Sequence, residues 1–521
     1  MKVDAIVIGS GFGGSVMACR LAEAGRHVVV LERGRRWAPE DYPRGPEDAW
    51  IWDAGAPERH NGWIDLRIMD EMWVAQGAGV GGGSLIYANI SVDAPSEAFR
   101  QGWPSAIDAA AMAPYYAQVA DMMEVQKLPR AQFTPRTKLM EEGAAAIGEA
   151  ARFKLLDLAV SFDARWDPAK MPPGDPAGSF PHLNRHGVAQ GSCMHCGNCD
   201  IGCAVQAKNT LDLNYLAVAE RAGAEIRPLT LVTHISSLGD RWRVHFDRLE
   251  EGRRVPGYLD AAQVFLAAGS LGSTELLLRS RDQYRSLSGL SNALGRNWSS
   301  NGDFLTPAFY PDRRISPTVG PTITAAIDFL DGSKGGRFFV EDGGLPNVLG
   351  NALEAMAVTA WSPLARRLLR KAAKRFARDP LDDMMPWFGQ SIDGADGVLY
   401  LGRKWLAPWQ RALKLDWQVA RSESGIGGLV AMHEQLSHAT GGTPRVPFSW
   451  TVFRNLVTPH PLGGCGMAAG SAAGVVDSHC EVFGHTGLFV VDGSVIPRPI
   501  GRNPSKTIAA LAERTAEIVM A

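Results

Sequence analysis

The 521-residue sequence lacks the features of a membrane-spanning, secreted or nucleic-acid-binding chain. No uninterrupted apolar run reaches about 18 residues, so no spanning helix is expected. The first predicted strand begins at about Val3, which leaves no room for a leader peptide, and a cytoplasmic location is expected. The formal net charge of -2 shows no basic excess, so no nucleic-acid partner is expected.

Cysteine is scarce outside one short stretch, which excludes a disulfide-rich secreted scaffold. Clustering of cysteines in a reducing compartment favours metal or redox chemistry instead. The clustered residues are Cys193, Cys196, Cys199 and Cys203, and the scattered ones are Cys19, Cys465 and Cys480.

The composition is that of an ordinary globular protein. Hydrophobic residues make up 45% of the chain and charged residues 21%, which excludes a disordered or fibrous chain. The chain is longer than those that usually fold around a single hydrophobic core, so we expect two lobes around a cleft.

The amino-terminal residues predict a dinucleotide-binding unit. Val3–Ile8 is a short β-branched run typical of a buried parallel strand, and Gly9-Ser10-Gly11-Phe12-Gly13-Gly14 follows it directly. Ser15–Ala24 has helical spacing, and His27–Leu31 predicts a second strand that ends at Glu32. Strand, GxGxxG loop, helix, strand and acid occur in the order of the dinucleotide-binding fingerprint.

Each residue type in this unit has a physical task. Gly9 permits the tight turn, Gly11 lets the backbone approach the pyrophosphate, and Gly14 lets the helix and strand pack closely. The helix start offers amide donors and a positive dipole to the phosphates. Glu32 stands where a carboxylate accepts hydrogen bonds from the adenosine ribose. The unit alone does not separate FAD from NAD.

Motifs in the rest of the chain decide between them. The chain resembles the glucose-methanol-choline (GMC) family of FAD-dependent oxidoreductases, whose motifs it carries in the family's order. The resemblance implies an α/β fold, in which a Rossmann-like FAD-binding domain with a parallel sheet is interleaved with an α+β substrate domain built on an antiparallel sheet. The motifs are Gly77–Ser84, Val264–Ser270, His460-Pro461-Leu462-Gly463-Gly464-Cys465, Leu488–Ser494 and Gly501-Arg502-Asn503-Pro504.

The resemblance also implies that both domains are discontinuous. We expect residues 1–95, 190–302 and 454–521 to form the FAD-binding domain, and residues 96–189 and 303–453 to form the substrate-binding or cap domain. Within the latter, Thr322–Leu330, a turn at Gly335-Gly336 and Arg337–Val340 predict neighbouring strands that form the floor of a pocket.

Within the family, HPLGGC and Trp298-Ser299-Ser300-Asn301-Gly302-Asp303 resemble most closely the bacterial cholesterol oxidases and related steroid or fatty-alcohol enzymes. The implied reaction is oxidation of an alcohol CH–OH group to a carbonyl by hydride transfer to the flavin. A lipophilic substrate, such as a sterol or fatty alcohol, is expected, with oxygen or another acceptor reoxidising the flavin.

His460 is the predicted catalytic base, because a histidine can take the hydroxyl proton near neutral pH while hydride leaves carbon. Asn503 matches the family's partner position and would orient the hydroxyl or contact the flavin. Tyr87 stands where cholesterol oxidases tend to carry a flavin-contacting asparagine, and Asn89 lies two residues further on. The positions that the resemblance assigns to FAD contacts are Gly9, Gly11, Phe12, Gly13, Gly14, Glu32, Gly81, Ser84, Asn89, Val232, Gly269, Asp492 and Asn503.

Cholesterol oxidases also use a glutamate of the substrate lobe to shift a double bond after oxidation. A registration over residues 341–350 puts Gly350 at that position, which leaves the isomerisation step without its carboxylate. Glu341 and Glu354 are the nearby alternatives, and both are expected to be solvated loop carboxylates.

The four clustered cysteines have the spacing C-x2-C-x2-C-x3-C of the bacterial ferredoxin iron–sulfur run. Ala204 replaces the usual proline after the fourth cysteine, and in ferredoxins that cysteine ligates another cluster. Reduced structural thiols or a zinc site are the alternatives. A cluster would make the chain a dehydrogenase that relays electrons to a protein or quinone partner.

Leu364–Arg378 predicts a basic amphipathic helix without an acidic residue. Such a helix can lie on an anionic membrane surface, and Met384–Phe388 would add an apolar patch beside it. A solvated helix packed on the substrate lobe is the alternative. Peripheral membrane contact would suit a lipophilic substrate.

Two other classes of protein explain less of the sequence. A nicotinamide dehydrogenase accounts for the amino-terminal unit and for none of the later motifs. A non-catalytic electron carrier needs no proton acceptor such as His460.

Overall fold

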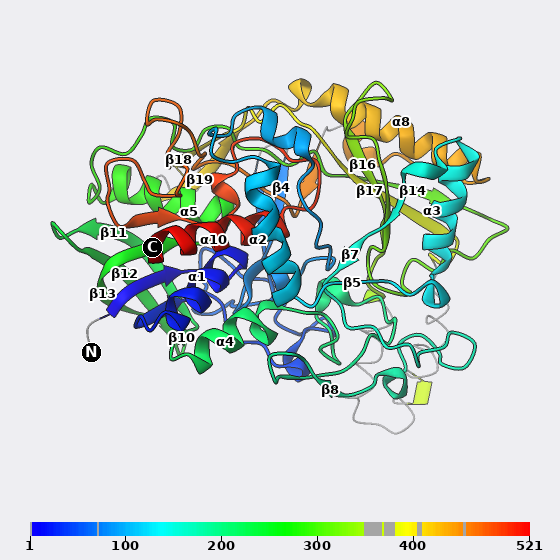
Figure 1. Ribbon diagram of the computed structural model, residues 1–521, viewed down its shortest axis with the longest axis horizontal. Coiled ribbons are helices and arrows are strands. Elements are labelled where there is room, and N and C mark those ends of the chain that lie inside the picture. The colour runs from blue at the N-terminus through cyan, green and yellow to red at the C-terminus, as the bar shows by residue number, and fades with distance from the viewer. Residues whose placement is uncertain (1–2, 70–71, 349–366, 369–380, 404–408, 452–454) are drawn as a thin grey trace.

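A computed structural model describes the arrangement of most of the chain, and two sheets dominate it (Figure 1). Apart from Arg367 and Leu368, the predicted basic helix Leu364–Arg378 lies outside the described residues, as do Gly350 and Glu354. The described residues are 3–69, 72–348, 367–368, 381–403, 409–451 and 455–521.

The first sheet contains the predicted dinucleotide-binding unit. In the described structure five mutually parallel strands lie in the order β10, β2, β1, β13 and β22. The first part of the long strand β13 pairs instead with β12, and β11 follows β12, both antiparallel. The bounds are β1 (Val3–Ile8), β2 (Val28–Leu31), β10 (Glu225–Arg227), β11 (Thr230–Ser237), β12 (Trp242–Glu250), β13 (Arg253–Leu266) and β22 (Leu488–Val490).

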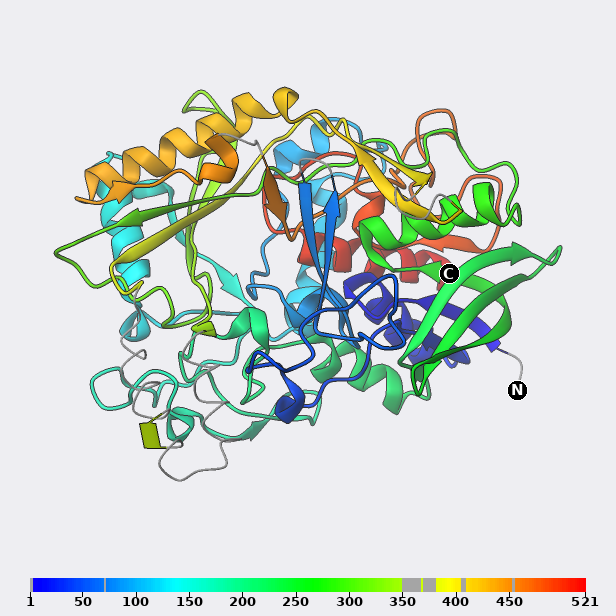
Figure 2. The ribbon, with the colours of Figure 1, turned by 180° about the vertical axis from the view of Figure 1, so that it is seen from behind.

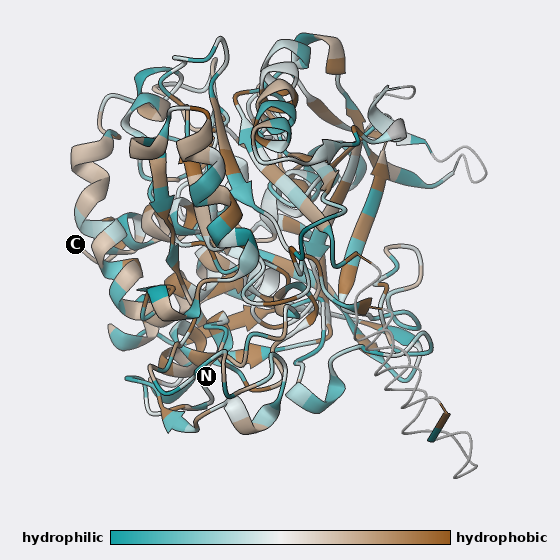
Figure 3. Cartoon of the chain, turned by 90° about the vertical axis from the view of Figure 1, so that its right-hand side faces the viewer, coloured by the Kyte–Doolittle hydropathy of each residue, from teal (hydrophilic) through white to brown (hydrophobic). Residues whose placement is uncertain are grey.

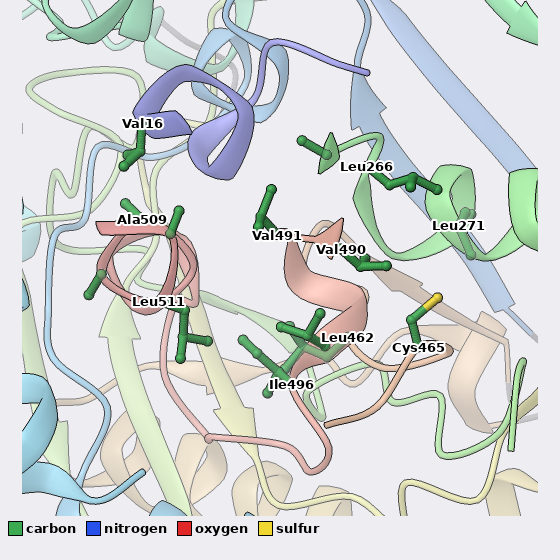
Figure 4. Close-up of a cluster of buried hydrophobic side chains, with 14 of the residues drawn as sticks. Val16, Leu266, Leu271, Leu462, Cys465, Val490, Val491, Ile496, Ala509 and Leu511 are labelled. Carbon is green, nitrogen blue, oxygen red and sulfur yellow. The ribbon is translucent and has the colours of Figure 1, made fainter. Parts of the chain in front are cut away.

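Helices from both ends of the chain pack together beside this sheet. α1 (Phe12–Glu23) follows the glycine loop, and α10 (Ser505–Met520) contacts both α1 and α2 (Ala109–Met122). Figure 4 shows Val16 of α1, Ala509 and Leu511 of α10, and Leu266 and Val490 of the sheet in one buried apolar cluster. In Figure 3 the hydrophobic colouring is concentrated on the interior strands. The first and last segments therefore share a core.

The second sheet is antiparallel, as predicted for the substrate domain. Helices α3 (Pro135–Ala146) and α8 (Glu423–Ala439) pack against it, at the right of Figure 1. Each of its strands lies within 96–189 or 303–453, whereas the point where one domain passes into the other stays a prediction. In the described structure the strand order is β20 (Thr443–Pro444), β14 (Phe304–Phe309), β17 (Met384–Ser391), β16 (Phe338–Asp342), β15 (Ala325–Asp328) and β6 (Phe153–Leu155).

Two predictions for this sheet have different outcomes. The strands predicted on either side of Gly335-Gly336 are β15 and β16, and they pair directly, with Ile327 opposite Val340. The prediction that Met384–Phe388 forms a surface patch is wrong. These residues begin β17, a strand between β14 and β16 whose side chains are almost all buried. The apolar run serves the core of the sheet.

A small third sheet brings together segments that are far apart in the sequence. β4 (Met72–Gly77) pairs with β3 (Ile64–Met69) and, in parallel, with β21 (Leu456–Thr458). The β3–β4 pair is the blue pair of strands near the centre of Figure 2. Since β4 leads into the predicted flavin loop and β21 leads into His460, this pairing brings the two motifs together. None of the described helices is long and apolar enough to cross a membrane.

Candidate active site

A cavity of about 870 Å³ has walls from both sheets. Gly9–Gly13, Glu32 and Val232 contribute to its wall on the side of the parallel sheet. Leu305 of β14 and Phe388 of β17 contribute on the side of the antiparallel sheet, together with His460 and Asn503. The cavity is therefore continuous between the predicted nucleotide-binding residues and the predicted catalytic residues.

The glycine loop is shaped as its sequence predicts. Gly9 has a φ of +98°, and a Cβ there would lie 2.4 Å from the carbonyl oxygen of Ala267. A Cβ on Gly14 would lie 2.1 Å from the carbonyl oxygen of Gly9, so helix and strand pack closely only because Gly14 has no side chain. α1 begins at Phe12, which places the first amides of the helix at the cavity wall.

Most of the predicted FAD contacts reach this wall, and four do not. Gly14 instead joins α1 to β1, and the Ser84 hydroxyl donates to the Gly81 carbonyl at 2.7 Å, which stabilises the loop. The residues at the wall are Gly9, Gly11, Phe12, Gly13, Glu32, Val232, Gly269, Asp492 and Asn503. Those behind it are Gly14, Gly81, Ser84 and Asn89.

Asn89 lies behind the wall, and its contact with the cofactor stays a prediction, since both polar atoms of its side chain lack a partner in the described structure. Its backbone is left-handed, with a φ of 68°, and its carbonyl accepts the Ala159 amide at 2.8 Å. The side chain is fully buried behind the wall. Tyr87 reaches the wall instead, with its ring 5.5 Å from that of Phe12. The left-handed backbone turns the chain between these two residues.

Two buried carboxylates hold the loops around the cavity. Glu32 accepts hydrogen bonds from the Ser10 amide at 3.0 Å and the Ser10 hydroxyl at 2.7 Å. Asp492 accepts from the Gly269 amide at 2.9 Å and from the Ser273 hydroxyl at 2.5 Å. Burial raises the pKa of Asp492, and these hydrogen bonds act in the opposite direction.

His460 is held by a buried aspartate that the sequence reasoning did not select. Its Nδ1 lies 2.8 Å from Oδ1 of Asp303, whose side chain is fully buried. The Thr458 hydroxyl donates to Oδ2 of Asp303 at 2.5 Å and accepts the His460 amide at 2.9 Å. Because an ionised carboxylate only accepts, Nδ1 carries the ring proton and Nε2 is left as an acceptor.

Loop packing fixes the position of this histidine. The amide and carbonyl of Leu462 exchange hydrogen bonds with Ser299, each 3.0 Å long. Leu462 and Cys465 are fully buried, and Figure 4 shows both beside Ile496 and Val490. The base therefore projects from a loop that belongs to the core.

Glu341 is a second carboxyl group beside the site. It belongs to β16, is fully buried, and accepts a hydrogen bond from the Gln390 side chain at 2.9 Å. Burial, helped by the charges of Asp303 and Asp342, raises the pKa of Glu341 to about 8, and hydrogen bonds from Gln390 and Asn503 oppose the shift. The expectation that Glu341 is a solvated loop carboxylate is wrong, because β16 lies inside the sheet.

We expect Glu341 to make stability depend on pH. Its pKa in the folded chain exceeds its ordinary value, so the folded state binds more protons than the unfolded state between about pH 4.5 and 8. Stability should therefore fall as pH rises through this window. In Glu341→Gln, the thermal midpoint of the FAD-loaded protein should fall less between these pH values than in the wild type. The exposed Glu251→Gln is the control, and equal pH dependence in wild type and Glu341→Gln would contradict the assignment.

The residues present fit FAD. The glycine loop and the first turn of α1 would hold the pyrophosphate, and Glu32 and Val232 would lie near the adenosine. Asn503 is buried at the wall, and its Oδ1 has no partner within the described structure, as expected of an amide that serves a bound molecule.

Comparison with known proteins gives the family. The family model described as GMC oxidoreductase matches residues 364–512, and one for an NAD(P)-binding Rossmann-like domain matches residues 7–38. The cholesterol oxidase of Mycobacterium tuberculosis is 32% identical over 554 aligned residues, covering 99% of this chain and 90% of that protein. The chain belongs to the GMC oxidoreductase family. It is an FAD-dependent enzyme that oxidises alcohol groups.

Other relatives agree with this assignment. The cholesterol oxidase of Acinetobacter baumannii is 29% identical to this GMC oxidoreductase, over 99% of this chain and 94% of that protein. The crystal structure of pyridoxine 4-oxidase from Mesorbium loti aligns with a TM-score of 0.64 and 16% identity, over 99% of both chains. That likeness concerns the fold.

The four clustered cysteines lie apart from His460. They line a second, small cavity together with Lys208 and Gly320. Within the described ranges, no three His, Cys, Asp or Glu residues converge as ligands of one metal ion.

Proposed function

We propose that this GMC oxidoreductase oxidises a lipophilic alcohol, either a sterol or a fatty alcohol, to the carbonyl compound. The observation that supports this is the apolar wall beside His460. A sugar would need many hydrogen-bonding partners, whereas a lipophilic alcohol needs them only at its hydroxyl. The names of the two cholesterol oxidase relatives agree with a sterol. The apolar wall residues are Leu305, Ile323, Leu345, Phe388 and Pro461.

The chain's own residues would handle the proton. Nε2 of His460 accepts it from the substrate hydroxyl, and Asp303 stabilises the positive charge that this places on the ring. Asn503 orients the hydroxyl through its amide. Bound FAD supplies the acceptor for the hydride that leaves the same carbon.

The position of Glu341 supports a second step on sterols. Movement of a double bond needs a carboxylate that takes a proton from one carbon near the new carbonyl and returns it to another. Glu341 lies close to Asn503 but behind the cavity wall, so this step would require its ionised form and a movement that brings it to the substrate. We propose Glu341 for the role that the registration on Gly350 left without a carboxylate.

A substrate panel tests the proposal. Under anaerobic conditions a sterol or a fatty alcohol should bleach the flavin absorbance near 450 nm, roughly the oxidised-flavin band, and a sugar should not. A sterol that lacks the hydroxyl is the matched control. If only sugars bleach the flavin, the proposed substrate class is wrong. Rapid recovery in air with peroxide indicates an oxidase, and slow recovery favours another electron acceptor.

Peripheral membrane contact through Leu364–Arg378 stays a proposal. It rests on the basic amphipathic pattern of that segment and on the lipophilic substrate, which would be drawn from a bilayer.

A further inference from the structure

Four cysteines that are spread over residues 193–203 meet at one small cavity. Left-handed backbone at His195 and Gly197, with φ values of 56° and 70°, reverses the chain between successive cysteines. Gly197 is required there, because a Cβ would lie 2.2 Å from the Thr318 carbonyl oxygen. The four thiols are free of disulfide bonds. The cavity wall contains Cys193, Cys196, Cys199 and Cys203.

Backbone amides lie close to these sulfur atoms. Those of Lys208, Val205 and Ala207 lie near Cys203, and that of Asn198 lies near Cys196. Amide groups around the sulfur atoms accompany and tune metal-bound thiolates.

Two positively charged side chains lie beside the same loop. Nζ of Lys208 is buried and donates to the carbonyls of Leu85 at 2.9 Å and Cys199 at 2.8 Å. Arg44 donates to the carbonyl of Gly202 at 2.7 Å. In the described part of the chain neither cation has a carboxylate oxygen within 4 Å. The carboxylates of Asp200 and Asp212 lie near Lys208 without pairing with it, and Arg44 is only half-buried. Two cations beside the thiols suit an anionic group between them.

The cysteine cavity and the FAD cavity share a wall. Nζ of Lys208 lies 4.7 Å from the centre of the Tyr87 ring, and Tyr87 lines the FAD cavity against Phe12. Asp200 and Ile201 directly follow Cys199 and also line the FAD cavity. Residues of one short segment therefore line both cavities.

We propose that Cys193, Cys196, Cys199 and Cys203 ligate an iron–sulfur cluster that takes electrons from the reduced flavin. The spacing C-x2-C-x2-C-x3-C is that of a ferredoxin run. In two-cluster ferredoxins the fourth cysteine serves the other cluster, but here Cys203 lies on the same cavity as the other three.

The electron balance defines the role of this site. Each alcohol oxidised to a carbonyl releases two electrons and two protons. The electrons leave singly through the cysteine site to an oxidised one-electron carrier protein, and the protons leave through His460 to solvent. The inference rests on the proposed function only for the source of the electrons.

Elemental analysis and spectroscopy test the site directly. FAD-loaded protein purified without oxygen should contain about four iron and four sulfide per chain, and dithionite should produce the electron paramagnetic resonance signal of a reduced cluster. Protein that holds FAD but contains no iron, or one zinc per chain, overturns the proposal. These readouts need no substrate, so they stand or fall independently of the alcohol panel.

A matched pair of variants tests the relay. Cys199→Ala should lose the iron and the reduction of ferricenium by alcohol, yet keep its FAD and the bleaching of the flavin by alcohol. Cys480→Ala, which removes a buried cysteine outside the loop, should keep all four properties. If Cys199→Ala keeps its iron, or reduces ferricenium as the wild type does, the assignment is wrong. If this variant fails to fold, the iron content and the electron paramagnetic resonance spectrum of the wild type decide whether the cluster is present.

Discussion

Replacing His460 by alanine is expected to lower kcat for alcohol oxidation by about 10²–10⁴-fold, because the hydroxyl proton then has no positioned acceptor. The flavin should remain bound, since the cavity wall on the parallel-sheet side is untouched. The measurement is the rate at which the substrate bleaches the flavin in a single anaerobic turnover, with FAD content determined on the same sample.

A surface histidine provides the control for this experiment. The side chain of His479 is 52% exposed, and His479→Ala should keep the wild-type rate. A His460→Ala protein that keeps both its FAD and its wild-type rate would remove His460 from the mechanism. Loss of FAD together with activity would instead show that the loop is needed to bind the cofactor.

Asp303 is expected to act through His460. Asp303→Leu leaves Nδ1 of the ring without its acceptor, and hydrogen bonds to charged groups are worth about 1.5–3 kcal/mol, so kcat should fall by about 10–150-fold. Asp303→Asn keeps a carbonyl oxygen and should lose less. KM should change little in both variants, because Asp303 is absent from the cavity wall.

A double-mutant cycle distinguishes positioning from a general structural effect. In a His460→Ala background, Asp303→Leu should cost little further activity, because the group that it positions is already absent. Additive losses would show that Asp303 acts on the fold as a whole.

The sequence predicts those features that local residues determine. The turn at Gly9, the helix after it and the acid at Glu32 follow one another within a short segment, and the structure places them as expected. The paired strands β15 and β16 were recognisable because a glycine turn separates two apolar runs.

Contacts between distant segments were not predictable in the same way. Asp303 and His460 are 157 positions apart, and their contact depends on the packing of β21 beside the start of β14. Glu341 ends an apolar run in the sequence, but only the strands on either side of β16 show that its carboxyl group is buried. The prediction of a surface patch at Met384–Phe388 was wrong for the same reason. An apolar run alone does not distinguish an inner strand from a surface patch.

The packing of α10 on α1 has a consequence for biosynthesis. Helix α10 completes the core that begins with β1, and β22 pairs with β13 in the same sheet. While the chain is still emerging from the ribosome, the amino-terminal half therefore lacks the surface on which it is to pack. The dinucleotide site can close only after α10 has left the ribosome, so the cofactor should be acquired after that point.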